Sequence, residues 1–184
     1  TLRVLPAAAL AKENRVMLVP IEVLDSGPKL SIREQWSGAT ESRWVRLDTP
    51  HGTVTCTSSW RFEGPHVPTV RIHAVDSEIS ILGARRGISG DVAGAPFRIY
   101  RPRYGLRRKN RTVLLEAPTV EMASVMTGWG AFDIVDRRSG DTLLRSGKST
   151  FIDADLDPTA VVLAIAFQRC GIIQTSTFLN YITL

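Results

Sequence analysis

The feature that most constrains the fold is an apolar segment near the end of the chain, for which the sequence predicts a helix over residues 157–171. Asp157 suits the N-cap position, and Pro158 suits the first helical position, where its missing N–H costs nothing. Every residue from Ala160 to Phe167 is apolar, so this helix has no polar face to turn toward water. It must therefore be surrounded by protein or by lipid.

The apolar run is too short to favour a membrane span. It covers eight residues before Gln168 and Arg169 interrupt it, whereas a span needs about twenty predominantly apolar residues. Extending the segment past Gly171 would provide the length, but it would also place Arg169, Gln174 and several threonines in the bilayer. The sequence therefore favours a buried core helix, with Gly171 suited to end it.

Most of the remaining chain is typical of short strands. Ten segments with strand-like patterns are separated mainly by turns rich in Gly, Pro and Asp. They are Arg15–Leu24, Leu30–Trp36, Arg43–Leu47, Thr53–Trp60, Thr69–Val75, Glu78–Leu82, Phe97–Tyr100, Thr112–Glu116, Ala131–Val135 and Thr142–Arg145. Such regular spacing predicts a barrel or a sandwich, and the apolar helix favours the barrel because a closed sheet can enclose it. We therefore predict an all-β fold with one buried helix, a closed antiparallel β-barrel enclosing the hydrophobic C-terminal helix, with a jelly-roll β-sandwich as the alternative.

Length and composition fit one domain. The 184 residues can bury a substantial core, and no repeat or low-complexity linker divides them. We therefore predict a single β-barrel domain over residues 1–184, with an N-terminal extension over residues 1–14. The two cysteines, Cys56 and Cys170, are too few for a disulfide framework. We interpret them as buried free thiols, which favours a reducing compartment.

One segment makes the chain basic. The 23 Lys and Arg residues exceed the 18 Asp and Glu residues by five, and the stretch from Arg98 to Arg111 holds seven basic side chains and no acid. Without those seven, 16 basic residues face 18 acidic ones, a balance of −2. Arginine suits phosphate because its planar fork makes bidentate contacts, and Tyr100 and Tyr104 are available for stacking on bases. The candidate anion-binding residues are Arg101, Arg103, Arg107, Arg108, Lys109 and Arg111. The competing interpretation is a solvated hairpin whose charges keep the barrel soluble.

Motifs typical of enzymes and metal sites are incomplete. Residues 147–149 (Gly-Lys-Ser) resemble the end of a phosphate-binding loop, but Thr142 stands where the first glycine belongs, so we predict a turn. Residues 153–157 resemble the start of a calcium loop, but Pro158 and Ala164 replace the required glycine and glutamate, so helix capping explains them better. The three histidines have no metal-type spacing with the cysteines, and no nucleophile elbow is present. We therefore predict no catalytic residue, no metal site, no cofactor and no enzymatic activity.

Two parts of the chain are similar to parts of a known family. They are the hairpin Phe132-Asp-Ile-Val-Asp-Arg-Arg-Ser-Gly-Asp-Thr-Leu-Leu and the helix that begins at Asp157-Pro158. In both, the chain resembles the tubby C-terminal-like fold, which includes tubby, the plant LURP-one-related proteins and the phospholipid scramblases. The resemblance implies a closed antiparallel barrel threaded by a hydrophobic C-terminal helix, and some members imply lipid binding. The residues after the helix and the segment 98–111 match no motif of that family.

These observations predict a non-enzymatic binding module whose basic loop contacts anionic phospholipid headgroups or other phosphate-bearing surfaces, nucleic acid included. Such a protein would be cytoplasmic and peripheral at a membrane. The alternative is a structural assembly protein, such as an RNA-binding viral coat subunit with a jelly-roll fold, located in the virion. The strand-like tail Ser176–Leu184 fits that alternative. A barrel that binds a small apolar ligand is a third interpretation, which a helix filling the interior would oppose. The sequence leaves the oligomeric state open.

Overall fold

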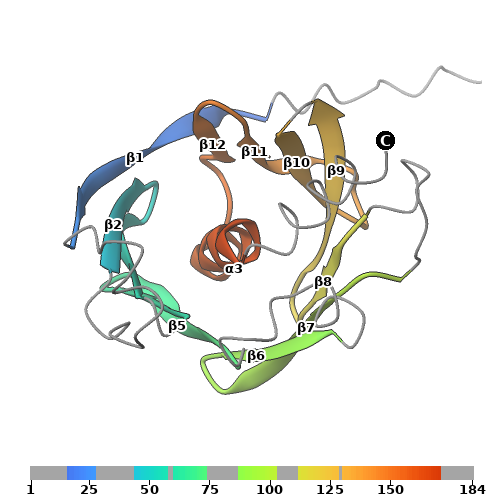
Figure 1. Ribbon diagram of the computed structural model, residues 1–184, viewed down its shortest axis with the longest axis horizontal. Coiled ribbons are helices and arrows are strands. Elements are labelled where there is room, and N and C mark those ends of the chain that lie inside the picture. Colours follow the sequence, from blue (N-terminus) through green and yellow to red (C-terminus); the bar gives the residue numbers. More distant parts are fainter. Residues whose placement is uncertain are drawn as a thin grey trace, which may run out of the picture.

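A computed structural model of the chain describes residues 16–27, 44–57, 60–73, 87–102, 112–128 and 130–170. Within these residues, twelve strands form one closed antiparallel barrel around a single helix, α3 (Pro158–Arg169) (Figure 1). The strands are β1 (Leu18–Ser26), β2 (Trp44–Thr49), β3 (Gly52–Thr57), β4 (Arg61–Gly64), β5 (Val67–Ile72), β6 (Ile88–Val92), β7 (Ala95–Tyr100), β8 (Leu114–Glu116), β9 (Glu121–Gly128), β10 (Ala131–Asp136), β11 (Thr142–Ser146) and β12 (Thr150–Asp153). The predicted all-β barrel around one helix is confirmed.

The strands follow one another around the barrel in chain order, and each pairs with the next. The first strand closes the sheet because β1 pairs with both β2 and β12, with Val23 opposite Leu47 and Val19 opposite Ile152. This meander differs from the jelly-roll alternative, whose strands alternate between two sheets. Barrels of roughly eight strands are just wide enough for side chains to fill. Twelve strands leave room for a helix.

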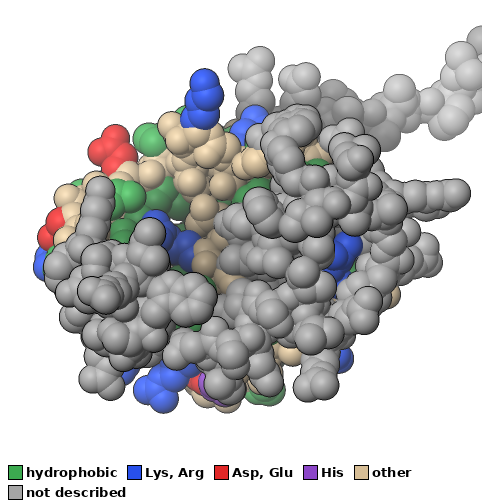
Figure 2. Space-filling model, viewed as in Figure 1, with side chains coloured by type: hydrophobic (Ala, Val, Ile, Leu, Met, Phe, Trp, Pro, Cys, Tyr) green, Lys and Arg blue, Asp and Glu red, His purple; other side chains and the backbone are tan. Residues whose placement is uncertain are grey.

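Side chains alternate between the inside and the outside of the barrel. In β7, Phe97 and Ile99 are buried on the inner face, whereas Arg98 between them is exposed. Seen along α3, charged side chains project around the periphery of the molecule (Figure 2). Position 90, on the inner face of β6, is occupied by glycine. A Cβ atom there would overlap the Phe97 ring and the backbone oxygen of Arg71. The apolar inner faces therefore converge on the helix.

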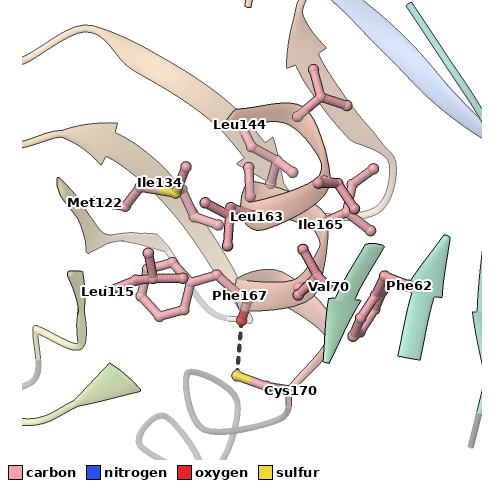
Figure 3. Packing of buried hydrophobic residues seen from close by; sticks show 14 of the residues in the cluster. Phe62, Val70, Leu115, Met122, Ile134, Leu144, Leu163, Ile165, Phe167 and Cys170 are labelled. Atoms are coloured by element: carbon pink, nitrogen blue, oxygen red, sulfur yellow. Dashed lines mark hydrogen bonds between the residues drawn. The ribbon is translucent and has the colours of Figure 1, made fainter. Parts of the chain in front are cut away.

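The helix α3 forms the centre of the core. All eight residues from Ala160 to Phe167 are buried, as the all-round apolar pattern requires. Leu163, Ile165 and Phe167 point toward different parts of the barrel wall (Figure 3). The wall residues labelled around them are Phe62, Val70, Leu115, Met122, Ile134 and Leu144. The prediction of a buried core helix is confirmed.

The start of α3 also agrees with the sequence. Asp157 Oδ1 accepts hydrogen bonds from the backbone N–H of Thr159 at 2.9 Å and of Ala160 at 3.1 Å, which is the geometry of an N-cap. The end differs from the predicted range, because the helix stops at Arg169 and Cys170 is its C-cap. The Cys170 thiol donates to the backbone oxygen of Phe167 at 3.0 Å (Figure 3). Cys56 and Cys170 are both buried and free, as predicted.

Several predicted strand boundaries were wrong. The predicted segment Thr53–Trp60 covers most of β3 but runs past its end, because β3 stops at Thr57 and Trp60 adopts a φ of 56° before β4 begins. Four strands were not predicted. β6 contains Gly90 and Asp91, β9 has few β-branched residues, and β4 and β12 have only four residues each. In each case pairing with neighbouring strands outweighs a weak local preference.

Other predicted segments lie outside the described residues. They are the extension 1–14, the strands Leu30–Trp36 and Glu78–Leu82, and the tail Ser176–Leu184. The hairpin that carries part of the family resemblance is described and forms as predicted, joining β10 to β11. In its turn, Asp136 Oδ1 accepts from the backbone N–H of Arg138 and Ser139, and Gly140 adopts a φ of 82°.

Candidate anion-binding surface

The basic segment 98–111 comprises the last three residues of β7 and most of the connection to β8. Arg98 is exposed on the outer face of β7, and Arg101 is partly buried directly after that strand. The structure therefore describes one of the six candidate anion-binding residues, Arg101. The other five lie outside the described residues, namely Arg103, Arg107, Arg108, Lys109 and Arg111.

Aromatic and acidic groups lie at the described start of this segment. The Arg98 guanidinium lies 5.0 Å from the centre of the Tyr100 ring, within the range of a cation–π contact. The Tyr100 hydroxyl donates to Glu116 Oε1 at 2.5 Å. This hydrogen bond, more than burial or the Glu116 charge, raises the pKa of Tyr100 above its ordinary value. Tyr100 is therefore a neutral donor at physiological pH.

Two arginines of the β10–β11 turn neutralise the acids beside the segment. Arg137 Nη1 donates to Glu116 Oε1 at 3.2 Å and to Glu121 Oε2 at 3.1 Å. Arg138 Nη2 donates to Glu121 Oε1 at 3.2 Å. The register places Arg98 opposite Glu116, and Glu116 opposite Glu121. The carboxylates nearest to the segment in the sheet are thus already engaged by cations from elsewhere in the chain.

The incomplete motifs have structural roles. Residues 147–149 form the turn between β11 and β12, where the Gly147 N–H donates to the Ser149 backbone oxygen at 3.2 Å. Asp153 Oδ1 accepts from the Asp155 N–H at 3.2 Å, and Asp157 caps the helix. Across the described ranges, no group of three or more His, Cys, Asp and Glu residues could hold a metal ion. In the same ranges, no helix is both long and apolar enough to cross a bilayer.

Two of the three histidines lie in neighbouring turns, and the third lies on the outside of the barrel. His51, in the β2–β3 turn, donates from Nε2 to the backbone oxygen of Leu156 at 2.6 Å. His66 is exposed in the β4–β5 turn. His73 Nε2 lies 2.9 Å from Asp91 Oδ2 on the outside of the barrel, and this pair hydrogen-bonds no hydroxyl or thiol of the described residues. They form no shared site in this part of the chain.

One basic residue inside the barrel was missed by the sequence interpretation, which treated Arg169 only as an interruption of the apolar run. Arg169 ends α3, and its Nε is buried with no hydrogen-bond partner among the described residues. Burial raises the pKa of the Cys56 thiol to about 11, and the positive charge of Arg169 opposes this rise. The signal that could have found it is an arginine that immediately follows a fully apolar helical run.

Comparisons with known proteins provide no assignment for this chain. No family model, no curated protein and no solved structure matches it. A functional interpretation must therefore rest on the residues and their arrangement.

Proposed function

We propose that this protein is a non-enzymatic binding module whose basic segment 98–111 contacts the anionic headgroups of a phospholipid surface. The observation that carries this proposal is the concentration of seven basic side chains, and no acid, in the segment 98–111, six of them between the end of β7 and the start of β8. The tubby-like resemblance supports it, since it implies a barrel threaded by a C-terminal helix and includes lipid-binding members. In this interpretation the protein performs no chemistry and associates peripherally with the membrane.

The acidic groups beside the segment support the proposal further. Glu116 and Glu121 accept hydrogen bonds from Arg137 and Arg138, so these arginines offset the negative charge next to the segment. These two carboxylates therefore add little negative charge beside the segment. Near an anionic membrane each basic side chain contributes about 1 kcal/mol, and this attraction decays over a Debye length.

The test is co-sedimentation of the full chain with vesicles at physiological salt. Vesicles of phosphatidylcholine alone are compared with vesicles that also contain phosphatidylserine. We expect binding only to the anionic vesicles. The triple variant Arg107→Ala, Arg108→Ala and Lys109→Ala should weaken that binding by up to about a hundredfold, since three basic contacts are removed.

A charge-matched control separates a local site from overall charge. The variant Arg46→Ala, Arg61→Ala and Arg71→Ala removes three exposed arginines from β2, β4 and β5, so both triple variants lower the formal charge from +5 to +2. Equal weakening in both variants would contradict a site at 98–111. Binding of single-stranded RNA, with no binding to either vesicle, would replace the lipid by nucleic acid as the ligand.

A further inference from the structure

The inner wall of the barrel between β1 and β2 is incompletely covered. Val23 lies opposite Leu47 in the antiparallel ladder, and side chains of such opposite residues project to the same face of a sheet. Leu47 is buried in the core with 2% of its surface exposed, so Val23 also faces inward. Nevertheless, 60% of the Val23 surface is exposed. Among the described residues, neither the helix nor the neighbouring side chains cover this part of the inner face.

The open part of the wall lies toward the C-terminal end of α3. His51 hydrogen-bonds Leu156, which places the β2–β3 turn beside the start of the helix. The opposite ends of these two strands, where Val45 pairs with Cys56, therefore lie toward the end of the helix. Val45 is two residues from Leu47 along β2 and so shares its inner face. Val23, Val45 and Cys56 are apolar residues of this inner face, which we call the β1–β3 wall, and Ser26 lies opposite Val45 beside them.

Arg169 faces this wall from the last turn of the helix. The preceding residue, Gln168, donates from Nε2 to Ser146 Oγ on β11 at 3.4 Å. Successive helical residues are rotated by about 100°, so Arg169 points away from β11. Its charge acts on the Cys56 thiol, which agrees with a position beside β3. In Figure 2 the molecule is hollowed over β1 and β2, and hydrophobic and basic side chains line the hollow.

The Nε atom of Arg169 finds no acceptor among the described residues. This atom is buried, and the side chain makes no ion pair with the described residues. Buried polar groups in folded proteins nearly always have a partner, because leaving one unsatisfied is unfavourable. The partial negative charge at the end of α3 favours the cation but gives Nε no acceptor. An anionic group from outside the chain would complete the arrangement.

We propose that this end of the barrel binds a single-chain anionic amphiphile, such as a long-chain fatty acid or a lysophospholipid. Its charged head would accept hydrogen bonds from Arg169, and its chain would cover the β1–β3 wall. The site accounts for both parts of the ligand, since the apolar wall suits the hydrocarbon chain and Arg169 suits the charged head. An apolar wall with no cation would favour a neutral molecule. This site uses no residue of the segment 98–111, so it is independent of the proposed membrane contact.

The test is a displacement assay on the full chain without vesicles, with cis-parinaric acid as the fluorescent probe. We expect palmitate to displace the probe and hexadecanol, which has the same chain length and no charge, to do so at least about tenfold less well. Lysophosphatidic acid shows whether the site prefers a phosphate or a carboxylate head group, because a phosphate site would bind it more tightly than palmitate. Displacement by either anion with little by the alcohol supports the proposal.

Two pairs of variants locate the site. Arg169→Gln should weaken palmitate about tenfold, whereas Arg169→Lys, which keeps the charge, should retain most of the affinity. Val23→Ser should weaken it too, and Val125→Ser is the matched control, since Val125 is 44% exposed but lies opposite Asp133 on the outer face. Circular dichroism identifies any variant that fails to fold.

Three results would overturn the proposal. They are no displacement by any amphiphile, equal displacement by palmitate and hexadecanol, or equal affinity of the wild type and a folded Arg169→Gln variant. The triple variant of residues 107–109 separates the two proposals, because it should bind palmitate normally while losing vesicle binding. Conversely, Arg169→Gln should bind anionic vesicles as the wild type does.

Discussion

His51 Nε2 lies 2.6 Å from the backbone oxygen of Leu156, and this hydrogen bond joins two segments that are 105 residues apart. It connects the β2–β3 turn to the chain directly before the N-cap of α3. The start of the helix is thereby fixed against the barrel wall on the side of β2 and β3. Since α3 supplies the centre of the core, this contact helps set the position of every buried helical residue.

Removal of this contact should lower stability. We expect His51→Ala to reduce the free energy of unfolding by about 1–2 kcal/mol, because the partly buried oxygen of Leu156 loses its donor. Urea denaturation measures the difference. His66→Ala is the control, since His66 is an exposed histidine in another turn. Equal losses in the two variants would show that the contact with Leu156 does not stabilise the fold.

The N-cap of α3 gives a second prediction. Asp157→Ala should destabilise the protein by about 1 kcal/mol, because two backbone N–H groups of the first turn lose their acceptor. The exposed Asp155, two residues earlier, provides a control that removes the same charge without removing the cap. Thermal unfolding of both variants distinguishes them. If Asp155→Ala were as destabilising, local charge rather than capping would be responsible.

The buried Cys56 thiol should make stability depend on alkaline pH. Its pKa is raised from the ordinary value of 9.0 to about 11, mainly by burial. Between these values the unfolded chain releases a proton that the folded protein retains. The free energy of unfolding should therefore be unaffected below about pH 9 and fall by about 2 kcal/mol as the pH rises to about 11. Urea denaturation at a series of pH values measures this slope.

Cys56→Ser is the control for this pH dependence, since a serine hydroxyl does not ionise in the range. The free energy of unfolding of this variant should fall less steeply between about pH 9 and 11 than that of the wild type, whatever the stability at neutral pH. Other groups that titrate in this range, Tyr100 among them, are common to both proteins and cancel in the comparison. Identical slopes would mean that the thiol is more exposed to solvent than its 7% exposure indicates.

A cross-strand ion pair gives the fourth prediction. Arg145 donates from Nε to Asp133 Oδ1 at 3.0 Å and from Nη2 to Oδ2 at 3.1 Å, and the two residues are directly opposite in the sheet. Because the Arg145 side chain is 54% exposed, solvent screening limits the interaction. A double-mutant cycle of Asp133→Asn and Arg145→Gln should give a coupling of about 1 kcal/mol or less.

Salt provides the check on that pair. The coupling should shrink between about 0.1 M and 1 M sodium chloride, because the Debye length falls from about 10 Å to about 3 Å. A coupling that does not change with salt would indicate packing of the Arg145 stem rather than charge.

The central architecture could be predicted because it depends on local and compositional signals. An apolar run behind Asp157 and Pro158 must be enclosed, and regularly spaced strands can enclose it. The turn at residues 136–141 was also predictable, because Asp136 and Gly140 carry its geometry within a few residues. Strands such as β6 and β12 were not predictable, since their short or interrupted sequences become strands only through pairing with neighbours.

Of the two candidate sites, one is visible in the sequence and the other is not. The basic segment 98–111 is visible in the sequence because its charges lie close together in the chain, and one of its six candidate binding residues, Arg101, is described. The β1–β3 wall is not visible, because Val23, Val45 and Cys56 come from three different strands. Even the hydrophobicity of Val23 says nothing about its exposure, which depends on what lies opposite it inside the barrel.

The sequence by itself determined that a helix with no polar face would be buried and that short strands would surround it, because burial of apolar surface follows from composition and periodicity. Only the tertiary structure decided how far the interior is filled and which charges face each other. Closure of the barrel brings the charge of Arg169 close enough to act on the Cys56 thiol, and it leaves Arg137 and Arg138 beside Glu116 and Glu121. These relations depend on the positions of residues in space, which no local pattern specifies.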